Sequence, residues 1–369
     1  MLESTTGSVV VGDLPMTRTV AALDAVHGAV DMVLDRFLDE RVAGLSALDP
    51  ALAPIGDEIA ALVRASGKRL RPAFVYWGHR ATGAAHDEVV FGPAAAVELL
   101  HTFALIHDDV MDRSAERRGR PAVHEGLART HDREGLDGDR SWFGIGGAIL
   151  AGDLAFVWAD ELFDAAELPP DVVAHARRVF TLLRIEVMAG QYLDLRLAGR
   201  LDASEGESLR VALLKSGRYT VTRPLQLGAA VGRGSRVLDD SLSAYGDATG
   251  LAFQLRDDVL GLFGDPSHTG KGALSDLREG KRTLLMLKAL DRARPAERDV
   301  LADCLGNPGL DEDAASRVRE IVVDSGALAA VERLLVEQQA LAHRALAGVA
   351  PPARQALEEL AEFAANRTG

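Results

Sequence analysis

The 369-residue sequence contains few of the residues that mark secreted or membrane proteins. Its one cysteine, Cys304, excludes an internal disulfide framework and is typical of a reducing cytosol. No run of 18 uncharged apolar residues occurs, so the sequence predicts no membrane span. Residues 1–16 lack the basic and apolar regions of a secretory signal, and we expect a flexible tail there. The composition therefore favours a cytoplasmic protein.

Basic side chains are also scarce. The chain has 41 Lys and Arg against 55 Asp and Glu, a net charge of −14, which makes nucleic acids and anionic membranes poor partners. Lysine is especially rare, yet four lysines stand beside Gly or Ser: Lys68, Lys215, Lys271 and Lys281. Because the lysine ammonium is a compact charge well suited to phosphate, these positions are candidate phosphate contacts as well as ordinary surface residues.

Alternation of polar and apolar residues is almost absent, which argues against a sheet. Apolar residues instead recur at spacings of three and four, as over residues 20–38, and this spacing predicts amphipathic helices. Residues 129–146 are polar and Gly-rich and predict a surface loop. With no repeat or linker in view, we expect residues 17–369 to form one all-helical domain.

Two predicted helices, over residues 93–106 and 248–263, are apolar on nearly every face, which predicts a buried position in a large bundle. The first leads into Asp108 and Asp112, which are four apart and share one helix face. Carboxylates beside a buried run need neutralising cations, and Mg²⁺ binds one or two carboxylates together with substrate phosphates. A solvated acidic helix end is the simpler interpretation, but the second helix repeats the pattern at Asp257.

Basic residues flank both acidic groups. Arg117 and Arg118 follow the first group, and Lys271 and Lys281 follow the second. Each alone would be an ordinary surface residue. Together they suggest an anionic ligand that a metal bridges to the acids, and a diphosphate fits both halves.

Several motifs, taken in their order along the chain, resemble those of the trans-isoprenyl diphosphate synthases (polyprenyl synthetases) over about residues 60–285. The pattern is most like that of a short-chain geranylgeranyl diphosphate synthase. The matching strings are Gly67-Lys68-Arg69-x-Arg71-Pro72, Asp108-Asp109-x-x-Asp112-x-x-x-x-Arg117-Arg118-Gly119, Gly190-Gln191-x-x-Asp194 and Phe253-Gln254-x-x-Asp257-Asp258. The resemblance implies a large helical bundle with a central cavity, an isoprenoid synthase-like fold. It also implies a homodimer.

The resemblance implies a role for each matching position. The metal ligands would be Asp108, Asp109, Asp112, Asp257 and Asp258, with Asp109 in support. The allylic diphosphate would bind Arg117, Lys215, Gln254, Lys271 and Lys281, with Ser216 where the family often has Thr. Isopentenyl diphosphate would bind Lys68, Arg71, His101 and Arg118. His101 would otherwise be interpreted as a core histidine. Catalysis would depend most on Asp108, Asp112, Asp257 and Lys215.

The implied reaction is the head-to-tail condensation of isopentenyl diphosphate with an allylic diphosphate, dependent on Mg²⁺, with three ions expected. The metal ions and basic residues would draw charge onto the leaving diphosphate, which would also take up the final proton. No side chain is nominated as general base.

The sequence departs from the family pattern at Gly261, where the second motif should carry a third acid. We expect Asp257 to supply the essential ligand, with Asp258, Asp276 or water completing the site. The missing acid should therefore be dispensable.

Phe103 and Ala104 lie five and four residues before Asp108 and are the candidate product-length residues. One bulky residue at this depth, with no insertion between Asp109 and Asp112, is most like a C20 (geranylgeranyl) synthase. A C15 (farnesyl) synthase is the near alternative, and Phe103 could also be simply a core residue.

Three other functions are compatible with parts of the pattern. A class I terpene cyclase shares the first acidic motif but needs a later Asn/Asp-Ser/Thr-Glu string and has no use for the Gly67–Arg71 site. His107-Asp108 could belong to an HD-type phosphohydrolase, but a convincing set of partner histidines is not found. A non-catalytic modulatory subunit would not need the intact acidic and basic sets.

Overall fold

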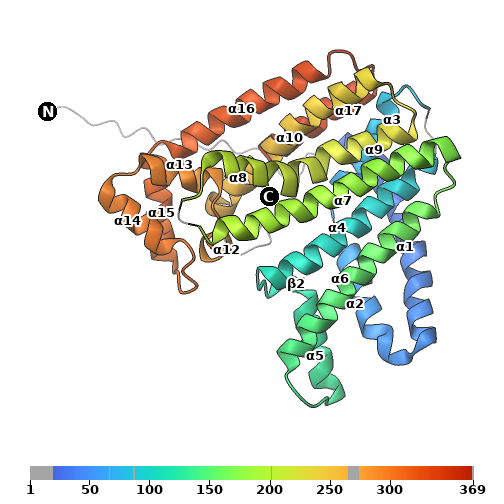
Figure 1. Ribbon diagram of the computed structural model, residues 1–369, viewed down its shortest axis with the longest axis horizontal. Helices are drawn as coiled ribbons and strands as arrows, with labels where there is room; N and C mark the ends of the chain where they lie inside the picture. The colour runs from blue at the N-terminus through green and yellow to red at the C-terminus, as the bar shows by residue number, and fades with distance from the viewer. Residues whose placement is uncertain (1–19, 66, 86–87, 201, 265–273, 368–369) are drawn as a thin grey trace.

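The computed structural model describes residues 20–65, 67–85, 88–200, 202–264 and 274–367, and these form a bundle of helices (Figure 1). The predicted all-α class is confirmed. The predicted tail, residues 1–16, and Lys271 lie outside the described residues.

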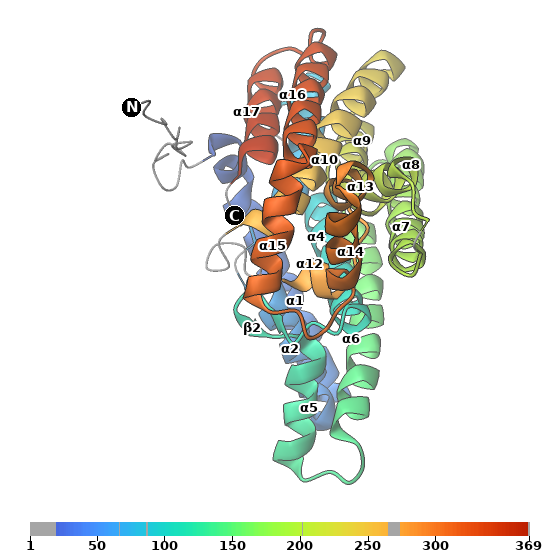
Figure 2. The same cartoon turned by 90° about the vertical axis from the view of Figure 1, so that its left-hand side faces the viewer.

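The helices are, in chain order, α1 (Ala21–Leu48), η1 (Pro50–Leu52), α2 (Ala53–Arg64), α3 (Leu70–Ala81), η2 (Glu88–Val90), α4 (Phe91–Met111), α5 (Val123–Glu134), α6 (Arg140–Asp164), α7 (Pro170–Ala198), α8 (Glu205–Val211), η3 (Ala212–Thr222), α9 (Arg223–Val231), α10 (Arg236–Phe263), α12 (Ser275–Arg278), α13 (Leu284–Arg292), α14 (Pro295–Cys304), α15 (Glu312–Asp324), α16 (Ala327–Ala345) and α17 (Ala353–Asn366). Figure 2 shows α5 at one end of the molecule and α16 and α17 at the other.

The two helices predicted to be central are α4 and α10. Nearly every side chain of α4 from Phe91 to Phe103 is buried, and α4 packs against α6 and α3. The buried side chains form two apolar clusters, and α10 contributes to both: Leu242 and Tyr245 to one, Leu255 and Val259 to the other. The acidic residues of α4 and α10 are thus carried on elements fixed by the core.

Two stretches are long and apolar enough to span a membrane by length and composition alone, Glu88–Met111 and Arg140–Asp164. The most apolar window of the first is 72% buried inside the protein, as expected for a central core helix of a bundle. The second is only 39% buried, so α6 leaves apolar side chains exposed. The long apolar sequence of α4 is therefore explained by its burial in the protein core.

Two local expectations were wrong. A small hairpin is present: β1 (Glu116–Arg117) pairs antiparallel with β2 (Arg120–Pro121). Strands of two residues are too short to leave an alternating pattern, so periodicity does not reveal them. The loop expected over residues 129–146 is also much shorter, because α5 continues to Glu134 and α6 already begins at Arg140. Asp139 caps α6 by accepting from the backbone N–H groups of Ser141 and Trp142.

The segment η3 is a π-helix, a form that is rare and often occurs at functional sites. Glycines let neighbouring helices approach it closely. A Cβ at Gly190 of α7 would lie 2.3 Å from the Lys215 backbone nitrogen, and a Cβ at Gly250 of α10 would lie 2.5 Å from Gly217. The side chains of η3 are therefore held tightly between α7 and α10.

Candidate active site

A cavity of about 850 Å³ opens between α4, α7, η3 and α10. It brings together most of the predicted site residues. Those that line it are Arg71, His101, Phe103, Ala104, Asp108, Arg117, Arg118, Lys215, Ser216, Gln254, Asp257, Asp258 and Lys281. Lys68, Asp109 and Asp112 do not line it directly.

Asp108 lies next to a cation from η3. The Lys215 Nζ is 3.4 Å from Asp108 Oδ1 and 2.6 Å from Asp194 Oδ2. Burial alone would lower the pKa of Lys215, but the two carboxylates outweigh it and the pKa is raised. Lys215 therefore stays charged beside Asp108. Asp194, on α7, matched the family motif but was given no role from the sequence.

Asp112 directly follows α4 and pairs with Lys281, which lines the cavity. The Lys281 Nζ lies 3.5 Å from Asp112 Oδ2, 3.1 Å from Asp276 Oδ1 and 2.5 Å from Glu279 Oε2. Burial opposes the charge of Lys281, but the carboxylates of Asp276, Asp112 and Glu279 raise its pKa well above the ordinary value. Lys281 therefore stays charged and lies beside Asp112; that both contact a bound diphosphate stays a prediction.

Asp109 is buried and turned toward Arg117. Arg117 donates from both Nε and Nη2 to the Asp109 carboxylate, with Nε 2.9 Å from Oδ1. The hairpin makes this possible, because Arg118 and Gly119 both have positive φ, as the two central residues of a type I′ turn do. Asp109 is therefore placed to orient Arg117, and its supporting part in metal binding stays a prediction.

The second acidic group divides into an accessible and a buried carboxylate. Asp257 is 52% exposed. Asp258 is buried and accepts a hydrogen bond from Gln254 Nε2 at 2.7 Å, and burial raises its pKa well above the ordinary value. Asp257 is therefore the carboxylate of this pair best placed for a metal.

Asp276 occupies the space left by the missing acid. A Cβ at Gly261 would lie 2.3 Å from the Asp276 Oδ2. The carboxylate of α12 therefore sits over the bare backbone of α10, one turn after Asp257. Of the three completions considered from the sequence, Asp276 is the one that this packing favours.

A second group of side chains surrounds Arg71, which lines the same cavity. Its Nη2 donates to Thr220 Oγ1 at 3.1 Å, and its guanidinium carbon lies 4.5 Å from the centroid of the Tyr219 ring. The Tyr219 hydroxyl lies 3.0 Å from His101 Nδ1. Tyr219 thus joins two predicted ligands of isopentenyl diphosphate. The sequence analysis missed it, although its place four residues after Lys215 was a usable signal.

Arg69, which lies between Lys68 and Arg71 in the sequence, positions both. Arg69 has a left-handed backbone and is buried, with Nη1 2.9 Å from Glu98 Oε1 of α4 and Nε 2.8 Å from Asp31 Oδ1 of α1. This charge-assisted pairing fixes the start of α3 against two other helices. Arg69 is structural, whereas Lys68 is exposed.

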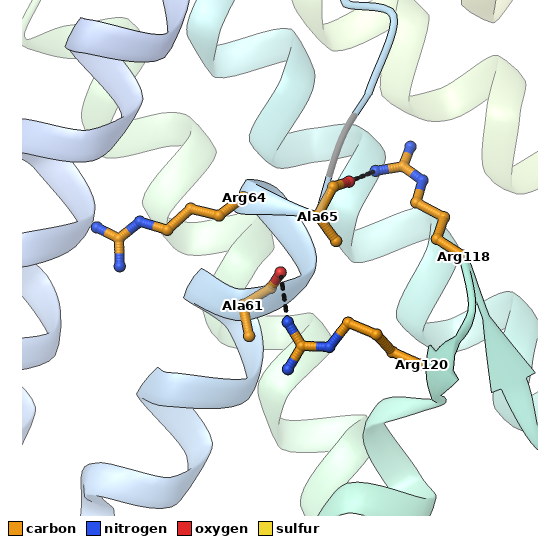
Figure 3. A pocket seen from close by; sticks show the side chains of 5 residues that line it. All are labelled: Ala61, Arg64, Ala65, Arg118 and Arg120. Carbon is orange, nitrogen blue, oxygen red and sulfur yellow. Dashed lines mark hydrogen bonds between the residues drawn. The ribbon is translucent and has the colours of Figure 1, made fainter.

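Arg118 also borders a smaller cavity of about 360 Å³ (Figure 3). Arg118 Nη1 donates to Ala65 O at 2.9 Å, and Arg120 Nη1 donates to Ala61 O at 3.3 Å. Arg64 points away from both and pairs with Asp35 and Asp39 of α1. The end of α2 therefore tethers Arg118 at the edge of the main cavity.

Phe103 forms an aromatic cluster at the wall of the cavity. Its ring centroid lies 4.8 Å from that of His107 and 5.1 Å from that of Phe156 on α6. Both contacts are edge-to-face, which holds the ring in place. Ala104 lines the same cavity without filling it.

The donor atoms suit a hard divalent cation that binds with a substrate. Among the described residues, no three acidic, His or Cys side chains lie close enough to hold a metal ion alone. Mg²⁺ typically uses one or two carboxylates and completes its shell with water and phosphate oxygens. Asp108 and Asp257, in one cavity with several cations, fit that requirement.

Comparison with known proteins agrees with this geometry. The family model described as "Polyprenyl synthetase" matches residues 54–322. The chain is 34% identical to the short chain isoprenyl diphosphate synthase of Methanothermobacter thermautotrophicus, over 83% of this chain and 88% of the relative. It is 35% identical to the geranylfarnesyl diphosphate synthase of Aeropyrum pernix, over 72% and 79%.

Among solved structures, the geranylgeranyl pyrophosphate synthase from Corynebacterium glutamicum, complexed with isoprenyl diphosphate and magnesium, has a TM-score of 0.89. It is 33% identical, over 94% of this chain and 99% of that one. The matched region contains both acidic helices and the cavity between them. The chain is therefore a member of the polyprenyl synthetase family.

Proposed function

We propose that the protein is a short-chain isoprenyl diphosphate synthase, which condenses isopentenyl diphosphate with an allylic diphosphate head to tail. The observation that carries the proposal is one cavity lined by carboxylates from both acidic helices and by three cations: Asp108, Asp257, Lys215, Lys281 and Arg71. The names of the relatives support the same reaction.

One set of residues binds the allylic diphosphate and another binds isopentenyl diphosphate. Asp108, Asp112 and Asp257 would hold the Mg²⁺ ions, three by our expectation, and the metal would supply Lewis-acid stabilisation of the leaving diphosphate. Lys215, Lys281 and Arg117 supply fixed positive charge at the same end. Arg71, His101, Arg118 and Lys68 hold isopentenyl diphosphate.

The product is proposed to be geranylgeranyl diphosphate. The relatives bear names for different chain lengths, geranylgeranyl and geranylfarnesyl, so overall similarity does not decide the length. The Phe103 ring, wedged between His107 and Phe156, supplies a floor close to the acids.

Condensation is tested with labelled isopentenyl diphosphate, an allylic diphosphate and Mg²⁺, omitting each in turn. We expect a longer prenyl diphosphate only in the complete mixture, and none from Asp108→Ala or Asp257→Asn at saturating Mg²⁺. Neither carboxylate closes the core, so both variants should remain folded. Cyclised product from the allylic substrate alone would indicate a terpene cyclase. Binding of both diphosphates without condensation would indicate a modulatory subunit.

We further propose a cytoplasmic homodimer that pairs through an exposed apolar surface on α6 and α7. Arg177 and Arg184 of α7 both pair with Asp160 near the end of α6, so the two helices come together there. Their exposed apolar side chains include Trp142, Leu150, Val157, Ile185 and Tyr192. Patches of this kind mark protein interfaces.

The oligomeric state is tested by sedimentation. The wild-type protein should sediment as a dimer, and the double variant Leu150→Asp/Val157→Asp as a monomer, because charges on this surface would oppose its burial. A matched change at Val336, exposed on α16, should leave the dimer intact. A dimer that survives the double variant would place the interface elsewhere.

A further inference from the structure

Arg367, immediately after α17, lies against the second acidic group. Its Nη2 is 2.8 Å from Asp257 Oδ1, and its guanidinium carbon is 3.8 Å from the centroid of the Phe253 ring. Nη2 also lies within 3.4 Å of Phe253 O. The Arg367 side chain is only 12% exposed and lines the main cavity. The guanidinium is thus buried against the site, whereas its carboxylate partner is half exposed.

The backbone that leads to Arg367 is fixed to the helix that carries Asp257. Arg256 Nε donates to Ala365 O at 2.6 Å, and the Arg256 guanidinium forms a two-point pair with Glu332, with both N–O distances 2.9 Å. Bidentate pairing of this kind fixes orientation as well as distance. Arg256 thus contacts the end of α17, and its neighbour Asp257 contacts the Arg367 side chain.

A second cation lies near Arg367. The Lys68 Nζ is 5.2 Å from the centroid of the Phe363 ring, and Phe363 is four residues, one helical turn, before Arg367. The Lys68 side chain reaches solvent, but partial desolvation by surrounding protein lowers its pKa, the positive charge of Arg367 lowers it further, and Asp257 opposes the shift. Asp257 therefore offsets two cations at this side of the cavity.

We propose that Arg367 is the counter-ion of Asp257 in the metal-free enzyme, and that a divalent cation must displace it to bind that carboxylate. The inference rests on the proposed function, because it takes Asp257 as a metal ligand. The displaced guanidinium keeps its stacking on Phe253 and is left beside Lys68. There the two cations form a site for the diphosphate of isopentenyl diphosphate. Metal at Asp257 and an anion at Lys68 therefore favour each other's binding.

Metal binding without substrate tests the first step. Mn²⁺ affinity is measured by titration of the diphosphate-free protein. Exposed ion pairs contribute up to about 1 kcal/mol, so Arg367→Gln should bind Mn²⁺ roughly two- to fivefold more tightly. Arg367→Lys, which keeps the charge, should stay near the wild type. The control Arg354→Gln removes a partly exposed arginine on the same helix and should change nothing.

The effect must act through Asp257. In an Asp257→Asn background, Arg367→Gln should no longer alter Mn²⁺ affinity. An unchanged affinity in the single variant, or an equal gain in both backgrounds, would overturn the proposal. These titrations need no turnover, so they are judged separately from the condensation assay. An inactive wild-type protein would refute the proposed function without altering the Mn²⁺ result.

Steady-state kinetics test the second step. Arg367→Gln should raise the KM for isopentenyl diphosphate and leave the KM for the allylic diphosphate near the wild-type value, because Lys68 lies on the first substrate's side. A purely structural role would move both constants together or lower the melting temperature. Equal changes in both KM values would overturn this part of the proposal.

Discussion

Tyr219 connects two side chains that are far apart in the sequence, Arg71 and His101. Its ring supports the guanidinium and its hydroxyl fixes the imidazole. Burial raises the pKa of Tyr219, so the phenol stays protonated and can donate to His101 Nδ1. When it does, the proton of the neutral imidazole sits on Nε2, where it can be donated to a phosphate oxygen.

Tyr219→Phe should therefore weaken isopentenyl diphosphate binding selectively. The ring and its stacking on Arg71 remain, but the hydrogen bond is lost, at about 0.5–1.5 kcal/mol for a typical bond. We expect the KM for isopentenyl diphosphate to rise severalfold, with the KM for the allylic substrate unchanged. If the variant has the wild-type KM for isopentenyl diphosphate as well as for the allylic substrate, the hydroxyl has no such role.

His101 makes the stability of the protein depend on pH. Burial, followed by the charges of Arg71 and Arg118, lowers its pKa well below the ordinary value of 6.5. The unfolded chain therefore binds a proton more readily than the folded one as pH falls below about 6.5, and stability is lost in that direction. Above this pH both states are neutral and the effect vanishes.

Melting temperatures of wild type and His101→Gln between pH 5 and 8 check this prediction. The wild type should lose more stability than the variant between pH 6.5 and 5, and the two curves should run parallel above pH 7. Parallel curves over the whole range would mean that His101 is protonated equally in both states.

At the scale of single elements, we expect α4 to determine how long a product the cavity can accept. Phe103 lies five residues before Asp108, roughly 7.5 Å along the helix, and its ring is fixed between His107 and Phe156. Phe103→Ala should lengthen the main product by at least one C5 unit, and Ala104→Phe should shorten it. Chromatography of the dephosphorylated products measures both. Unchanged length in both variants would place the floor elsewhere, for example at Met188 of α7, which also lines the cavity.

Gly261 of α10 and Asp276 of α12 share one space. Restoring the family's acid with Gly261→Asp forces the Asp276 carboxylate to move, since a Cβ at this position lies 2.3 Å from its Oδ2. The moving group is the end of a flexible side chain, so we expect a modest change in activity and stability. Asp257→Asn should instead abolish most turnover. The ratio of kcat values for the two variants checks this, and a Gly261→Asp variant as inactive as Asp257→Asn would contradict it.

Across the whole molecule, periodicity predicted the helices, and apolar residues on nearly every face predicted α4 and α10 as central elements. Roles that depend on long-range packing were not accessible to the same reasoning. Asp109 turns to Arg117 because of a two-residue turn, and Arg367 reaches Asp257 only because α17 packs on α10. Adjacent acids in a motif look equivalent in sequence, whereas burial makes Asp108 and Asp109 different.

That residues 17–369 form one domain stays a prediction. It is supported by α10, which contributes side chains to both apolar clusters, so neither cluster is complete without it. Limited proteolysis should yield no stable fragment that ends within α10. A stable fragment that begins after Phe263 would indicate two independent units.

A crystal structure with Mn²⁺, isopentenyl diphosphate and a non-cleavable allylic diphosphate analogue tests the central claim most directly. Anomalous scattering should place Mn²⁺ at Asp108 and Asp112 and at Asp257, around the allylic diphosphate. Isopentenyl diphosphate should contact Arg71 and His101, with both hydrocarbon chains directed into the cavity. Metal at only one acidic helix, or an allylic diphosphate bound away from Lys215 and Lys281, would contradict the account.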